Sequence, residues 1–259
     1  MKCSLENKLK KELFVSLFYN LKNCSTLLSL VFKKEGLFIQ GMDKSHVCMY
    51  EVNINKDWFH TYENDEIESI ISLDSQTFFS VLNLVNDFYK MEIYQKDSLK
   101  DNLNIDLLVQ NEKSGEFSKY FIIPLAEIDF ELFTLPNIEY EVDFSMDAKK
   151  ICEITNQLLL FGSDLEIICN EEKIQLGTNG ISGNMMVNIL LNDLKEFSIA
   201  EGEYIVLKYS LSYLGKMCLS NKLSNVIEFS LSGEYPMRIN YDLGENSSLK
   251  FFIAPKIMD

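Results

Sequence analysis

Hydrophobic and polar residues repeat with the period of an α-helix in four segments of the chain. Within Lys11–Lys22, the apolar residues Leu13, Phe14, Leu17, Phe18 and Leu21 fall on one helical face. Similar spacing occurs in Ser75–Leu84, Asp147–Leu159 and Ser210–Leu219. These four segments are predicted to be short amphipathic helices with one face buried.

Elsewhere the alternation has a period of two, which is typical of half-buried antiparallel strands. Apolar and polar residues alternate along Ile227–Ser232 and again along Met237–Asp242. Most of the remaining chain shows strand character, so the pattern predicts an α+β fold.

The two halves of the chain repeat each other. Ser118–Pro124 can be laid over Leu249–Pro255 at an offset of about 131 residues, and the first two predicted helices match the last two at similar offsets. The repeat predicts two similar domains, 1–124 and 138–259, each with two helices on antiparallel sheets.

The stretch 125–137 interrupts the repeat and is predicted to be the linker between the domains. Pro124 and Pro136 bracket it and favour an extended crossover. Its mixture of acidic and apolar residues leaves a core helix as the alternative.

Composition restricts the function classes. The chain has 47% hydrophobic residues, enough for a folded core, but no apolar run near the roughly 18 residues that span a bilayer. The N-terminus lacks the apolar stretch of a signal peptide, so we expect an intracellular protein without membrane contact. Six scattered cysteines predict reduced, mostly buried thiols.

The formal net charge of −15 argues against a surface that simply adheres to phosphates. His46 and His60 are the only histidines, and phosphate-loop, nucleophile-elbow and dinucleotide motifs are absent from the sequence. We therefore expect no enzyme, metal site or cofactor, although a carboxylate-only active site stays open.

Three separated segments carry distinctive motifs: Gly36–Val47 (GLFIQGMDKSHV), Leu132–Pro136 (LFTLP) and Leu249–Ile257 (LKFFIAPKI). The last resembles the C-terminal signature of the proliferating cell nuclear antigen (PCNA) family, and the first resembles that family's Q-[SA]-M-D-x-[SA]-H segment. Leu132–Pro136 falls where the family has the end of its linker. The three motifs occur in the family's order, and the resemblance covers essentially the whole chain.

The resemblance implies a sliding clamp in which three copies close into a ring, with the helices lining the hole and duplex DNA held topologically. It implies a nuclear processivity factor for DNA replication and repair, with a DNA polymerase and a clamp loader among its partners. The alternatives are one subunit of a heterotrimeric checkpoint or archaeal-type clamp, a monomeric viral-type factor, and an unrecognised enzyme.

The same resemblance assigns three sets of residues. Client peptides of the form Q-x-x-[LIM]-x-x-[FY]-[FY] would bind Met42, His46, Val47, Phe133, Leu135, Pro136, Pro236, Ile253, Ala254, Pro255 and Lys256. The DNA-facing set is Lys10, Lys11, Lys22, Lys149, Lys150 and Lys216. Edge strands near Phe117–Ile122 and Lys173–Thr178 would pair between subunits through Phe117, Lys119, Tyr120, Ile122, Ile174 and Leu176.

Each assignment competes with an ordinary structural explanation. The apolar residues could belong to the core, His46 could be structural, and the lysines could lie on solvated helix faces. Glu171 aligns where many clamps have a modified lysine, so modification-based damage tolerance is not expected to transfer.

Overall fold

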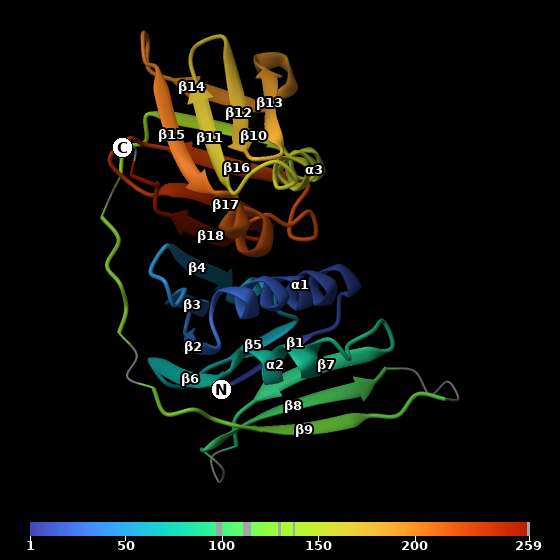
Figure 1. The fold of residues 1–259 in the computed structure, drawn as a ribbon. Coiled ribbons are helices and arrows are strands. Elements are labelled where there is room, and N and C mark those ends of the chain that lie inside the picture. Colours follow the sequence, from blue (N-terminus) through green and yellow to red (C-terminus); the bar gives the residue numbers. More distant parts are fainter. Residues whose placement is uncertain (97–99, 111–114, 129–130, 137, 258–259) are drawn as a thin grey trace. The chain divides into compact units, whose positions relative to one another are not determined.

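The computed structural model describes residues 1–96, 100–110, 115–128, 131–136 and 138–257 (Figure 1). The chain forms two compact units. Unit 1 consists of Met1–Gly41, Glu51–Phe133 and Leu243–Ser248, and unit 2 of Met42–Tyr50, Thr134–Asp242 and Leu249–Asp259. Each unit combines helices with antiparallel sheets, which confirms the α+β prediction.

Strands are assigned here to the unit that holds most of their residues. The helices of unit 1 are α1 (Lys8–Cys24), the short η1 (Lys56–Trp58) and α2 (Ser75–Leu82). Its strands are β1 (Lys2–Leu5), β2 (Leu27–Lys33), β3 (Gly36–Met42), β4 (Cys48–Asn55), β5 (Thr61–Glu63), β6 (Glu68–Asp74), β7 (Tyr89–Tyr94), β8 (Asn102–Val109) and β9 (Lys119–Pro124).

The helices of unit 2 are α3 (Ala148–Leu158), the short η2 (Leu191–Asp193), α4 (Leu211–Tyr213) and η3 (Leu214–Cys218). Its strands are β10 (Val142–Asp147), β11 (Asp164–Cys169), β12 (Lys173–Gly180), β13 (Gly183–Leu190), β14 (Glu196–Ile199), β15 (Ile205–Ser210), β16 (Val226–Leu231), β17 (Met237–Gly244) and β18 (Ser247–Ile253).

The strand order within the sheets is the same in both units. Unit 1 has the orders β5-β1-β7-β8-β9 and β4-β3-β2-β6, and unit 2 has β14-β10-β16-β17-β18 and β13-β12-β11-β15. Adding nine to each strand number of unit 1 therefore reproduces unit 2. The repeat found in the sequence corresponds to a repeated topology.

Side-chain caps explain where three of the helices begin. Asn7, Asp74 and Asp147 each accept a hydrogen bond from a backbone N–H in the first turn of α1, α2 and α3. The buried face of α1 includes Phe18, whose ring meets that of Phe78 on α2 edge-on, with centroids 4.8 Å apart. This aromatic contact holds the two helices of unit 1 together.

Two of the predicted elements differ in detail. The helix predicted at Ser210–Leu219 is one turn of α4 followed by the wider π-helical turn η3, in which the Leu219 N–H donates to the Leu214 carbonyl at 2.9 Å. The described linker residues, 125–128 and 131–136, form neither helix nor strand, as the extended crossover requires. Asp129, Phe130 and Asn137 of that linker lie outside the described residues.

Two general expectations can also be compared with the fold. The six cysteines are free, and all but Cys152 are buried, which confirms the expectation of unpaired, mostly buried thiols. Within the described part of the chain, no helix is both long and apolar enough to cross a membrane.

Candidate partner-binding site

The turn that follows β3 belongs to unit 2. It is organised around the buried carboxylate of Asp43. One oxygen of Asp43 accepts hydrogen bonds from the N–H groups of Val47 and Cys48 at 2.8 and 2.7 Å. The other accepts from the Ser45 N–H at 2.8 Å and from the Tyr213 hydroxyl at 3.1 Å. The carboxylate thus replaces water for several backbone donors of the turn.

These hydrogen bonds also set the ionisation of Asp43. Burial disfavours its charged form, but the bonds from Cys48, Ser45, Val47 and Tyr213 outweigh burial and lower its pKa. His46 follows with a φ of 57° in the left-handed region and an exposed side chain. Sequence reasoning named His46 but did not assign a role to Asp43, although Asp is a typical turn residue because its side chain can accept from the backbone N–H two residues on, here that of Ser45.

The C-terminal residues of unit 2 lie against this turn. The Ala254 N–H donates to the Val47 carbonyl at 3.0 Å, directly after β18 ends. The Lys256 N–H donates to the Lys208 carbonyl on β15 at 2.7 Å, and the Lys256 ammonium pairs with Asp164. The segment 254–256 is therefore held at both ends, between the turn and β15.

The predicted client-peptide residues differ in exposure. Met42, Val47, Leu135, Pro236, Ala254 and Pro255 are half-buried, whereas His46, Phe133, Pro136 and Lys256 are exposed. Ile253 is fully buried, so in this structure its side chain packs in the core beneath this surface rather than on it. Phe133 belongs to unit 1, and the other members belong to unit 2.

Gln40, which the sequence analysis left out of the site, holds the backbone of Phe133. Its amide oxygen accepts from the Phe133 N–H at 2.8 Å, and its amide nitrogen donates to the Phe133 carbonyl at 3.1 Å. Both residues belong to unit 1. The glutamine therefore fixes the end of the linker within that unit while the Phe133 side chain remains 46% exposed.

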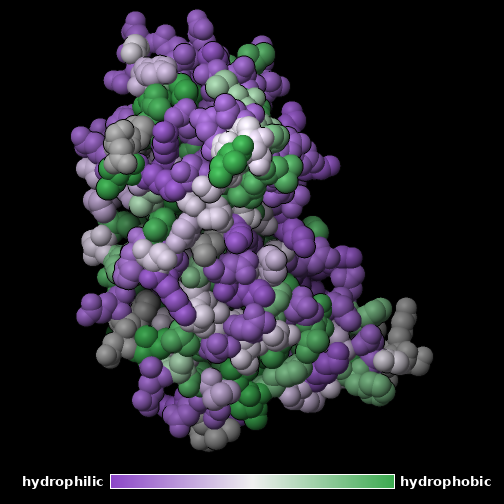
Figure 2. All heavy atoms as spheres, in the orientation of Figure 1, coloured by the Kyte–Doolittle hydropathy of each residue, from purple (hydrophilic) through white to green (hydrophobic). Residues whose placement is uncertain are grey.

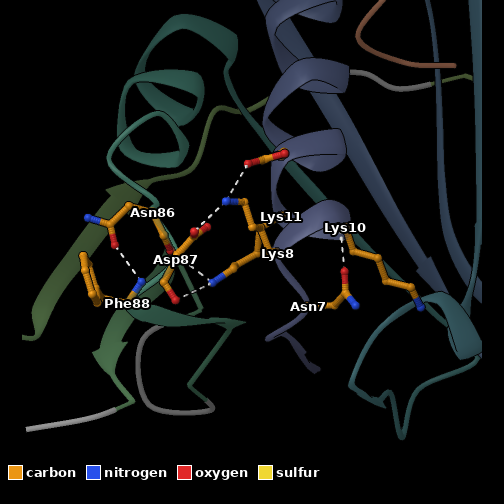
Figure 3. Close-up of polar contacts among 8 residues, drawn as sticks. Asn7, Lys8, Lys10, Lys11, Asn86, Asp87 and Phe88 are labelled. Atoms are coloured by element: carbon orange, nitrogen blue, oxygen red, sulfur yellow. Dashed lines mark hydrogen bonds and ion pairs between the residues drawn. The ribbon is translucent and has the colours of Figure 1, made fainter. Parts of the chain in front are cut away.

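Lys11 does not fit the predicted DNA-facing set. Its side chain is 2% exposed, and its ammonium donates to the carbonyls of Asn86, Asp87 and Tyr89 at 3.0, 3.5 and 2.5 Å. Figure 3 shows Lys8 and Lys11 extending from α1 toward this loop. Because all three donors are used inside unit 1, Lys11 is a structural residue and we remove it from the set.

The remaining predicted lysines keep access to solvent. Lys10 pairs with Glu245 at 2.7 Å, and Lys22 lies over the ring of Phe79 at 4.4 Å. Lys149, Lys150 and Lys216 are exposed in unit 2, and Lys149 is 4.0 Å from Glu153 on the same helix. Glu171 is exposed and accepts a hydrogen bond from the Gly202 N–H at 2.7 Å.

The strand edges match one half of the predicted interface. β9 is an edge strand of unit 1, and Phe117, Tyr120 and Ile122 are exposed on it or beside it, at 77%, 68% and 61%. Lys119 is half-buried on the same strand. Figure 2 shows exposed hydrophobic atoms of unit 1 around the β8–β9 hairpin.

The other half of the predicted interface is wrong. Ile174 and Leu176 are buried on β12, which is paired on both sides, with β11 and with β13. The edge strands of this sheet are β13 and β15, and on β13, the neighbour of β12, Met186 and Leu190 are 62% and 59% exposed. The resemblance assigned the interface to the strand at Lys173–Thr178, whereas the edge is formed by the next strand, β13.

Comparison with known proteins identifies this architecture. Residues 4–132 match the model of the proliferating cell nuclear antigen N-terminal domain, and residues 134–256 match that of the C-terminal domain. The fold and the matched domains are those of a DNA sliding clamp. The chain belongs to the proliferating cell nuclear antigen family; it is a non-catalytic clamp of DNA replication.

Individual relatives are distant but cover most of the chain. The chain is 27% identical over 263 residues to proliferating cell nuclear antigen 2 of Plasmodium falciparum, covering 98% of this chain and 99% of that protein. It is 29% identical over 230 residues to the antigen of Chaetomium thermophilum, covering 86% of each. A PCNA2–PCNA3 complex from Sulfolobus tokodaii shares the fold, with a TM-score of 0.85, 19% identity and 99% coverage of both chains.

Proposed function

We propose that three copies of this chain close head to tail into a ring that encircles duplex DNA, with β9 of each copy paired to β13 of the next. The observation that carries this proposal is the pair of edge strands with exposed apolar side chains. An edge of this kind presents unpaired backbone groups and invites association, which a closed ring satisfies.

The experiment is a mass measurement by light scattering across a range of protein concentrations. We expect three times the 30.0 kDa mass of one chain. A particle of one chain at every concentration would contradict the homotrimer. It would favour the second candidate, one subunit of a heterotrimeric ring, which is supported by the solved relative being a complex of two different subunits.

The surface formed by the Asp43 turn and the segment 254–256 is proposed to bind client peptides of a DNA polymerase, a clamp loader and other replication or repair proteins. Half-exposed Val47, Leu135 and Pro255 supply apolar contacts, and the hydrogen bonds of the turn hold the backbone in place. A rigid apolar surface of this type suits a peptide with aliphatic and aromatic anchors. The relatives being eukaryotic supports a nuclear location.

Replacing Val47 and Leu135 together with alanine should weaken a Q-x-x-[LIM]-x-x-[FY]-[FY] peptide by about 2 kcal/mol, because both truncations remove anchor contacts. Calorimetry measures the affinity. Ile253 is left unchanged, because truncating a fully buried side chain would open a cavity and confuse binding with folding. Ile67→Ala, at a position 85% exposed in unit 1, is the matched control and should bind normally. Unchanged affinity of the double variant would contradict the site.

A further inference from the structure

The sheet β14-β10-β16-β17 of unit 2 carries two parallel rows of polar side chains across its strands. The backbone register places Ser198, Asp143, Ser230 and Arg238 in one row, which we name the arginine row. Two residues along each strand, the register places Glu196, Ser145, Glu228 and Asn240 in a second row, which we name the glutamate row. Side chains two residues apart on a strand point to the same face, so both rows share one face.

The charges of the arginine row are paired within the row. Arg238, the single arginine of the chain, donates from Nη2 to the Ser230 hydroxyl at 2.8 Å and lies 3.7 Å from the Asp143 carboxylate. Its guanidinium also covers the Tyr140 ring at 4.7 Å. A carboxylate and a serine hydroxyl on neighbouring strands therefore hold a guanidinium in this row.

The glutamate row has the same acceptors but no cation. Asn240 occupies the place that corresponds to Arg238, and its neutral amide donates to Glu228 at 2.7 Å. Among the described residues, neither a hydrogen bond nor an ion pair engages the Glu196 carboxylate or the Ser145 hydroxyl. Ser145 is 3% exposed as a residue and lines the hollow described next.

A hollow of about 360 Å³ lies over both rows. Its lining from the glutamate row is Ser145, Glu196 and Glu228. The four residues of the arginine row and three phenylalanines, Phe144, Phe197 and Phe229, complete it. Glu196 and Glu228 each lie one strand away from Ser145, so their backbones are about 10 Å apart. In the part of the hollow over the glutamate row, Ser145 therefore lies between two carboxylates.

We propose that the glutamate row binds the guanidinium of an arginine side chain presented by a partner protein. The charge is complementary, because the row carries two carboxylates and Asn240 neutralises neither. A planar guanidinium has five donors and can reach both glutamates and the Ser145 hydroxyl, whereas a lysine ammonium is a compact point charge. In the arginine row, the chain's own Arg238 likewise contacts a serine hydroxyl and a carboxylate, those of Ser230 and Asp143.

The site does not depend on the ring or on the client-peptide surface, since every residue that forms it belongs to unit 2 and none belongs to those sites. It can therefore be tested whether or not the proposed function holds. The probes are N-acetyl-arginine amide and its uncharged isostere, N-acetyl-citrulline amide, titrated onto the full chain at low salt and followed by saturation-transfer NMR.

We expect saturable binding of the arginine probe and at least tenfold weaker binding of the citrulline probe, because charged hydrogen bonds are lost. The variant E196Q/E228Q should weaken arginine binding at least tenfold. The control E172Q/E201Q changes the net charge equally at two exposed loop positions of unit 2 and should bind normally. Thermal melting checks that both variants fold.

Several outcomes would overturn the proposal. Binding of the arginine probe that does not saturate would show that there is no specific site. Equally tight binding of the citrulline probe would show that the charge of the guanidinium plays no part. An equal loss in the control would reduce the effect to overall electrostatics. Equally tight binding of N-acetyl-lysine amide would contradict the choice of a guanidinium.

Discussion

Asp43 shows how one side chain can organise a turn, here the turn that is proposed to bind partner peptides. Its carboxylate accepts hydrogen bonds from three backbone N–H groups of residues 45, 47 and 48, while the Ala254 N–H binds the Val47 carbonyl in the same turn. The residues proposed to contact a peptide, such as exposed His46 and half-buried Val47, therefore depend on a residue that is itself buried.

Replacing Asp43 with alanine should reduce the free energy of unfolding by about 2–3 kcal/mol at neutral pH, since buried N–H donors lose a charged acceptor. Urea unfolding followed by circular dichroism measures the change. Asp43→Asn keeps the shape and one oxygen acceptor and should cost less.

The same contribution should depend on pH. The folded pKa of Asp43 lies below its unfolded value of about 3.9, so its stabilisation is complete above that value and is lost as the pH falls through the folded pKa. The difference between the wild type and Asp43→Asn should therefore shrink below about pH 4. A difference that is the same at pH 7 and pH 3 would show that ionisation of Asp43 plays no part.

At the scale of elements, β13 is the strand through which unit 2 is proposed to pair with another subunit. β13 pairs with β12 through a hairpin whose two-residue loop lies between Gly180 and Gly183. In such a hairpin the flanking pair is hydrogen-bonded and the pattern alternates along the strands. The N–H of Met186 accordingly points away from β12 and is open to a neighbouring strand.

Met186→Pro should abolish ring formation while unit 2 remains folded, because proline removes an outward N–H that the proposed intersubunit ladder would use. Light scattering measures assembly, and circular dichroism checks the fold. Met186→Thr keeps the N–H and should assemble normally. A proline variant that still forms rings would mean that β13 does not form the interface.

At the scale of the whole molecule, the net charge of −15 makes direct phosphate binding weak. Because the Lys11 ammonium is buried and bonded inside unit 1, fewer lysines of the predicted set are accessible to DNA. A clamp of this kind is expected to hold DNA by enclosure rather than by contacts.

Protein loaded by a clamp loader onto nicked circular DNA should persist there and be lost rapidly after the circle is cut, because an open end lets a ring slide off. Blocking both ends with bulky groups should restore retention. Co-sedimentation of protein with DNA measures this at physiological salt. Equal retention on open linear and circular DNA would show that direct contacts hold the protein.

The sequence by itself determined the features that repeat or that depend on local spacing. The helix predicted at Lys11–Lys22, which lies within α1, and the alternation along β16 and β17 follow from the side-chain period of a single helix or strand. The two-fold repeat follows from comparing the two halves of the chain. The motif containing Asp43 and His46 and the C-terminal motif were likewise sufficient to indicate the family.

Only the tertiary structure decided which groups remained unpaired. β12 and β13 both have strand character in sequence. In the sheet, however, β12 has a neighbour on both sides and β13 has a neighbour on one side only. Lys11 has the sequence context of a surface lysine, but in the structure its ammonium donates to three carbonyls of the loop Asn86–Tyr89. Edge position and burial depend on contacts between residues distant in the chain, and local periodicity contains no information about those contacts.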